Sequence, residues 1–131
     1  MAKMIIMFPG VGYTMDFPLM YYASFLYEAK GYEQIHMKYN SILFEPDLTR
    51  EEKTLKARDY VWEKVKDIDF SVYDEVVFLS KRFGTAEAGI LAERLGIQPM
   101  YVEGADHSLE VKGKPFESLE ILKDVMRYIE R

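Results

Sequence analysis

The sequence contains no cysteine among its 131 residues. This absence excludes disulfides, thiol catalysis and metal sites built on cysteine, and it suits a reducing compartment. A basic tract is absent as well, because acidic and basic residues are interspersed and the formal net charge is -5. Proteins that bind phosphate backbones need a basic face, so we expect no nucleic-acid partner.

Long apolar runs are also missing, since the longest is far shorter than the ~20 residues of a membrane-spanning helix. The pattern of a strand begins by Met4, which leaves no room for a signal peptide. We therefore expect a cytoplasmic protein without a membrane partner. Hydrophobic residues at 49% and charged residues at 30% describe a globular chain, and its length predicts a single domain spanning residues 1–131.

The patterns that are present alternate between strand and helix. Continuous apolar runs at Met4–Phe8 and Glu75–Leu79 predict buried parallel strands. Residues 33–39 alternate instead, with Gln34, His36 and Lys38 on a solvated face, which predicts a strand at the edge of a sheet. A short fourth strand is predicted at residues 99–103, and residues 40–47 are assigned to a loop.

Four helices are predicted between and after these strands. The first begins at Pro18 and ends near Gly31. Thr49 and Glu52 have the spacing of a capping box at the start of a long second helix. The inner stripe of this second helix comprises Ala57, Val61, Val65 and Ile68. The helix from Gly84 to Gly96 has an inner stripe of its own, which comprises Ala88, Leu91, Ala92 and Leu95. Pro115 opens the last helix.

Strand and helix thus follow each other four times, which predicts an α/β fold. The expected architecture is a three-layer α/β/α sandwich with a four-stranded parallel sheet in the order 2-1-3-4. Ligands of such sheets bind at the carboxyl ends of the strands, where the strand order reverses. That point lies between the first and third strands, beside residues 8–16 and 80–85.

Three segments together resemble a small α/β-hydrolase of the serine-hydrolase superfamily. They are MIIMFPGVGYTMD (4–16), VVFLSKRFGTAEAG (76–89) and MYVEGADHSLE (100–110). They resemble the oxyanion loop, the nucleophile elbow and the loop of the catalytic histidine. The resemblance implies a minimal hydrolase core of flavodoxin-like shape, with His107 in the position of the catalytic base. It also implies oxyanion-hole amides in the following residues: Gly10, Val11, Gly12 and Phe83.

The chemistry of the elbow departs from this family. The elbow pattern G-x-S-x-G carries the nucleophile at its third position, which Arg82 occupies here. A guanidinium stays protonated in proteins, so it is neither nucleophile nor general base. Between Arg82 and His107 the chain fits one helix and one short strand, which leaves no segment for the triad acid. We expect a truncated, catalytically inactive domain whose His107 is a vestigial base.

Two alternatives remain open. The first is a flavodoxin-like module that binds a small anion, an ester or a partner at the rim around Arg82. Its anion site would comprise the residues at the helix start: Lys81, Arg82, Gly84 and Thr85. The second, weaker alternative is a residual esterase that works through His107 and water. An aromatic cluster comprises Tyr13, Phe17, Tyr21 and Tyr22. We expect it either to line an acyl pocket or to pack in the core, and helical spacing favours the core for at least half of the cluster.

Neither a metal nor another cofactor is expected, because the two histidines lie on different elements without a recognised ligand spacing. The fourth strand ends the predicted sheet with apolar residues Met100, Tyr101 and Val102. An apolar edge of this kind tends to be covered or paired. We therefore expect a homodimer through this strand.

Overall fold

The computed structural model describes residues 2–9, 18–80, 83–103, 123, 124 and 127. The final helix predicted from Pro115 lies outside the described residues. The described elements are β1 (Ala2–Phe8), α1 (Pro18–Ala29), β2 (Glu33–His36), α2 (Asn40–Leu43), α3 (Arg50–Val65), the 3₁₀ turn η1 (Phe70–Val72), β3 (Tyr73–Ser80), α4 (Phe83–Leu95) and β4 (Met100–Glu103).

The strands form a parallel sheet in the order β2-β1-β3-β4. β1 pairs with β2, where Met7 lies opposite His36, and with β3, where Phe8 lies opposite Ser80. β3 pairs with β4 on its other side. The predicted α/β class, a parallel sheet with helices, is therefore confirmed. Met100 on β4 is 57% exposed, and the dimer expected through this strand stays a prediction.

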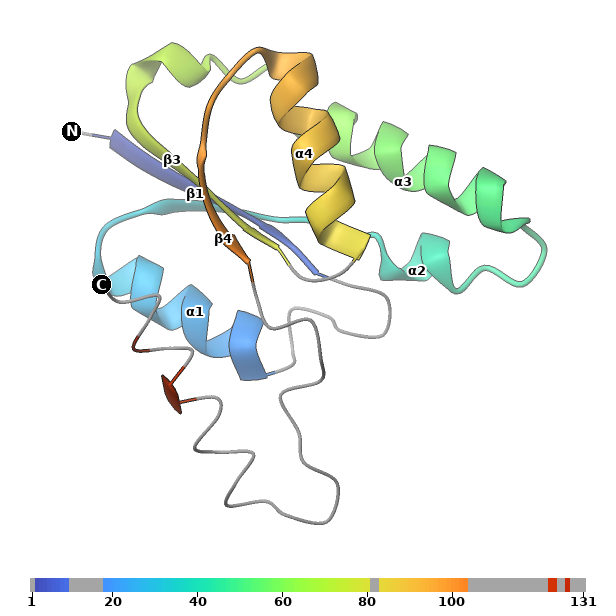
Figure 1. The fold of residues 1–131 in the computed structure, drawn as a ribbon, viewed down its shortest axis with the longest axis horizontal. Helices are drawn as coiled ribbons and strands as arrows, with labels where there is room; N and C mark the ends of the chain where they lie inside the picture. Colours follow the sequence, from blue (N-terminus) through green and yellow to red (C-terminus); the bar gives the residue numbers. More distant parts are fainter. Residues whose placement is uncertain (1, 10–17, 81–82, 104–122, 125–126, 128–131) are drawn as a thin grey trace.

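Helices cover both faces of β1, and all of its residues from Met4 to Phe8 are buried (Figure 1). Because side chains alternate along a strand, Met4, Ile6 and Phe8 share one face and pack in a core with α3 and α4. Ile5 and Met7 are fully buried on the opposite face. The buried residues of α1 lie outside the first core: Met20, Ala23 and Tyr27. This separation places α1 on the second face.

Several local predictions are confirmed. The side chain of Thr49 caps α3 by accepting a hydrogen bond from the backbone N–H of Glu52 at 3.1 Å. The predicted inner stripes of α3 and α4 are buried at Ala57, Val61, Val65, Ala88, Leu91 and Ala92. Gly31 and Gly96 follow α1 and α4 with φ angles of +80° and +68°. Only glycine adopts this left-handed conformation without strain, so both helices end there.

The end of β2 differs from the prediction. The strand stops at His36, although the alternating pattern extends to Tyr39, and residues 40–43 form α2 where a loop was predicted. The neighbouring strand β1 ends at Phe8, one residue beyond the partner of His36, so the ladder can extend no further than Met37, whose N–H still donates to the carbonyl oxygen of Met7 at 3.0 Å. Tyr39 is instead buried, and its hydroxyl donates a hydrogen bond to the carbonyl oxygen of Pro9 at 2.6 Å. The chain therefore leaves the sheet at this point.

Gly84 brings the start of α4 against the end of β1. A Cβ atom at this position would lie 2.0 Å from the carbonyl oxygen of Phe8 and 2.6 Å from its carbonyl carbon. Both obstacles are backbone atoms of a fully buried strand, so they have little freedom to move. Glycine is required here by close approach and not by an unusual φ angle.

We expect Gly84→Ala to destabilise the protein by about 3 kcal/mol or more, because the added methyl group overpacks a rigid contact. Gly89→Ala on the same helix is the matched control, since a Cβ there meets nothing within 4 Å. The control should stabilise the protein by ~0.5–1 kcal/mol through helix propensity. Urea unfolding midpoints measure both changes, and equal stabilities of the two variants would contradict the contact.

Candidate functional site

The predicted hydrolase elbow is described on both of its sides. β3 ends at Ser80 and α4 begins at Phe83. The oxyanion-loop residues, the two basic residues and the histidine lie outside the described residues: Gly10, Val11, Gly12, Lys81, Arg82 and His107. Three of the predicted site residues are described: Phe83 begins α4, and Gly84 and Thr85 lie in its first turn.

The hydroxyl of Ser80 is enclosed at the end of β3. The residue is fully buried, and its Oγ lies 3.1 Å from Oγ1 of Thr85. Gly84, which precedes Thr85, packs closely against the backbone of Phe8. Two residues predicted to hold an anion, Gly84 and Thr85, therefore have structural roles at the base of α4.

Glu87, one turn further along α4, is a buried carboxylate that the sequence analysis missed. It is 2% exposed, and its Oε1 lies 3.5 Å from Nη2 of Arg58 on α3. Neither Oε2 of Glu87 nor Nε of Arg58 has a hydrogen-bond partner among the described residues. Burial, and secondarily the charge of Glu87, raises the pKa of the Tyr39 hydroxyl well above its usual value. Tyr39 thus keeps the proton that it donates to Pro9.

We expect Arg58→Met to destabilise the protein by about 1–3 kcal/mol, because it leaves the carboxylate of Glu87 buried without its partner. The double variant Arg58→Met/Glu87→Met should recover most of this loss, since no buried charge remains. Lys66→Met is the control, because the Lys66–Glu63 pair is shorter, at 2.9 Å, but lies at the surface. Thermal unfolding should show no measurable change for the control. A double variant no more stable than Arg58→Met would contradict the burial cost.

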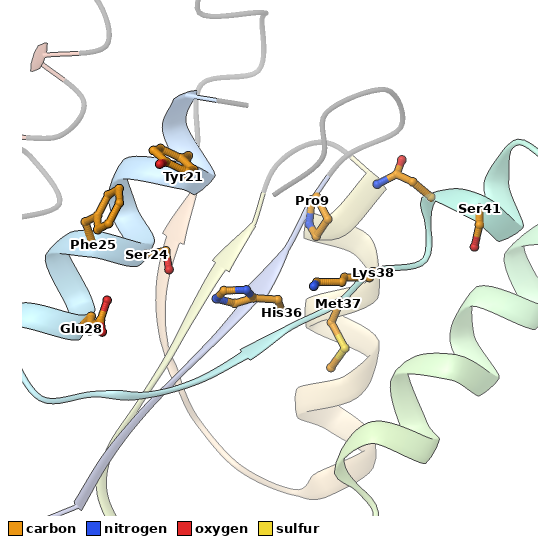
Figure 2. A pocket seen from close by; sticks show the side chains of 10 residues that line it. Pro9, Tyr21, Ser24, Phe25, Glu28, His36, Met37, Lys38 and Ser41 are labelled. Carbon is orange, nitrogen blue, oxygen red and sulfur yellow. The ribbon is translucent and has the colours of Figure 1, made fainter. Parts of the chain in front are cut away.

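A pocket of about 620 Å³ lies between α1 and the chain that follows β2 (Figure 2). Its volume falls within the range of small-molecule sites, roughly 300–1,000 Å³. Its lining residues are Pro9, Tyr21, Ser24, Phe25, Glu28, His36, Met37, Lys38, Asn40 and Ser41. Since Pro9 follows β1 and Met37 follows β2, the pocket lies at the carboxyl ends of these strands. The sequence predicted the neighbouring position, between β1 and β3.

Aromatic side chains of α1 form one wall of the pocket. Tyr21 and Phe25 are 47% and 53% exposed, and their rings meet edge to face with centroids 4.9 Å apart. Tyr22, which does not line the pocket, is also about half exposed. The core therefore does not account for Tyr21 or Tyr22, while the other two aromatic residues of the predicted cluster lie outside the described part of the chain.

His36 lines the pocket, and the face predicted to be solvated is so only in part: His36 and Gln34 are half-buried, whereas Lys38 is exposed. α1 packs beside β2, and the side chain of Gln34 bridges them: its Nε2 donates to the carbonyl oxygen of Ser24 at 2.8 Å. Its Oε1 accepts the hydroxyl of Ser24 at 2.9 Å and lies 2.7 Å from Nε2 of His36. An amide oxygen only accepts, so His36 carries a proton on Nε2, and Nδ1 holds the lone pair when the ring is neutral.

Electrostatics keep this imidazole neutral near pH 7. Burial lowers the pKa of His36 below its usual value, and the charge of Lys38 lowers it further. Lys38 and Glu28, both exposed, are the charged side chains that line the pocket with His36. The unfolded chain takes up a proton at higher pH than the folded protein does. The stability from neutral His36 is therefore complete above about pH 6.5 and is lost as the pH falls from there towards the folded pKa.

We expect nuclear magnetic resonance (NMR) titration to give His36 a pKa below the usual value of about 6.5. Lys38→Met should raise this pKa, because it removes the neighbouring positive charge, but not to the usual value, because burial remains the larger cause. Lys56→Met, an exposed position on α3, is the control and should leave the titration unchanged. A pKa of His36 at or above 6.5 in the unmodified protein would contradict the burial.

No group of three or more His, Asp or Glu side chains among the described residues is arranged to hold a metal ion. Within the same part of the chain, no helix is both long and apolar enough to cross a membrane. Comparisons with protein-family models, curated proteins and solved structures found no match. The function is therefore inferred from the site itself.

Proposed function

We propose that this chain is a catalytically inactive α/β-hydrolase-like domain that binds a small ligand at the carboxyl rim of its sheet. The observation that carries this proposal is the pocket of about 620 Å³ at the ends of β1 and β2. It combines an aromatic wall with a few polar groups, as ligand sites do. The hydroxyl of Ser24 on its wall donates to Gln34 and not to His36, so these two residues do not form a nucleophile–base pair.

We further propose that the core is a four-stranded, three-layer sandwich of the minimal hydrolase type. The parallel pairings of β1 with β2 and β3, and of β3 with β4, support this architecture. The strand-to-helix step from Ser80 to Phe83 supports the elbow, because α4 begins directly after β3. The contact of Gly84 with Phe8 supports it too, because it accounts for the one glycine of the elbow pattern that this chain retains.

The loss of catalysis follows from residue types and burial. Arg82 stands at the nucleophile position and cannot attack a carbonyl. Ser80, the nearest hydroxyl before it, is fully buried and lies against Thr85. The short chain between Arg82 and His107 has no segment for a triad acid. These three features support a binding role over the residual esterase alternative.

The flavodoxin-like module remains the second candidate, and it shares the binding role. It differs in placing an anion at Lys81 and Arg82, on the β3 side of the rim. The pocket favours the β2 side, because its described lining residues belong to or follow β1, α1 and β2.

We expect no stoichiometric labelling of the protein by a fluorophosphonate probe, because no serine stands at the elbow tip. Arg82→Ser should not restore turnover in the ordinary enzymatic range of roughly 10⁴ M⁻¹s⁻¹ or above, since the orienting acid is missing as well. Intact-mass spectrometry and an ester panel measure these outcomes, with an active serine hydrolase as the positive control and Ser80→Ala as the matched variant. Labelling that disappears in Ser80→Ala would refute the proposed inactivity.

A further inference from the structure

The pocket between α1 and β2 has two walls of different chemistry (Figure 2). On the α1 side, Tyr21 and Phe25 leave about half of their surface to water. Aromatic rings offer large apolar faces and edges against which another flat ring can pack. On the opposite side, Lys38, Asn40 and Ser41, from the chain that follows β2, line the cavity. A ligand that fills the pocket meets rings on one side and polar groups on the other.

Lys38 is the one charged residue of the polar wall among the residues that the structure describes. Its side chain extends towards His36 (Figure 2), and no ion pair joins it to another residue of the described chain. His36 adds no positive charge at pH 7, because its pKa is lowered. Among the described lining residues, the only carboxylate is that of Glu28 on α1. The potential is therefore favourable to an anion near Lys38 and unfavourable to one near Glu28.

Unused hydrogen-bonding capacity lies beside the same wall. Oδ1 of Asn40 is buried without a hydrogen-bond partner among the described residues. The exposed hydroxyl of Ser41, the next residue, also lines the cavity. Buried polar atoms cost free energy unless they are paired. Because Oδ1 is an acceptor, a ligand group that carries a donor, such as a hydroxyl, would pair with it, while the hydroxyl of Ser41 can donate to an anion.

We propose that this pocket binds a small aromatic anion, a flat ring that carries a carboxylate or a phosphate. The ring packs against Tyr21 and Phe25, and the anionic group binds Lys38 and accepts a hydrogen bond from the hydroxyl of Ser41. This assignment rests on the proposed binding function and adds the chemical class of the ligand.

The direct test is an NMR titration of the protein with phenyl phosphate and with phenylacetate at pH 7. Benzyl alcohol, which is neutral, and inorganic phosphate, which lacks the ring, are the matched controls. We expect both aromatic anions to shift the amide signals of residues around Tyr21, His36 and Lys38. Each control compound should bind roughly tenfold more weakly, because it satisfies only one wall.

Three charge variants sharpen the test, and all three positions are exposed, so the fold should be retained. Lys38→Gln should weaken phenyl phosphate binding by roughly tenfold, and Glu28→Gln should strengthen it by about two- to threefold by removing a like charge. Lys56→Gln, on α3, should leave the affinity unchanged. Phe25→Ala should weaken phenyl phosphate but not inorganic phosphate.

The outcomes separate the ligand class from the binding function. If benzyl alcohol binds as tightly as phenyl phosphate, or if Lys38→Gln has no effect, the pocket binds a ligand but the anion assignment is wrong. If no aromatic compound shifts the signals of pocket residues, the inference fails. Labelling by the fluorophosphonate probe would instead overturn the proposed inactivity, whatever the titration shows.

Discussion

The structure depends most on the contact between the start of α4 and the end of β1. A methyl group at Gly84 would lie 2.0 Å from the carbonyl oxygen of Phe8, so the helix and the strand touch through their backbones. This contact places the first turns of α4 against the sheet. It thereby buries Ser80 beneath Thr85 and brings Glu87 to Arg58 on α3. The positions of α3 and α4 on β1 thus depend on Gly84, where there is no room for a side chain.

The same end of β1 also organises the pocket. The carbonyl oxygen of Pro9 accepts the hydroxyl of Tyr39, which draws the chain after β2 over the rim. Burial and the charge of Glu87 keep that hydroxyl protonated, so the donor persists. Lys38, Asn40 and Ser41 then form the polar wall opposite α1. The start of α4 and the pocket are therefore neighbouring parts of one rim, joined by Phe8 and Pro9.

The chemistry of this rim suits recognition better than catalysis. Gln34 orients the ring of His36 through Nε2, while Gln34 itself is held by both the hydroxyl and the carbonyl of Ser24. The result is a neutral imidazole with a defined tautomer, but no hydroxyl among the described residues is paired with it as a nucleophile. Lys38 supplies a fixed positive charge beside it. Such an arrangement supports the proposed role in ligand binding, in which shape, charge and hydrogen bonding select the ligand.

The sequence by itself determined the features that depend on neighbours along the chain. These include the α/β class, the capping of α3 by Thr49, the glycine ends at Gly31 and Gly96, and the apolar stripes of α3 and α4. Tertiary structure alone decided the early end of β2, the partial burial of His36, the burial of Glu87, and the position of the pocket. Each of these depends on contacts between residues far apart in sequence, which periodicity within a segment does not report: β2 loses its partner where β1 ends, α1 covers His36, and α3 encloses Glu87.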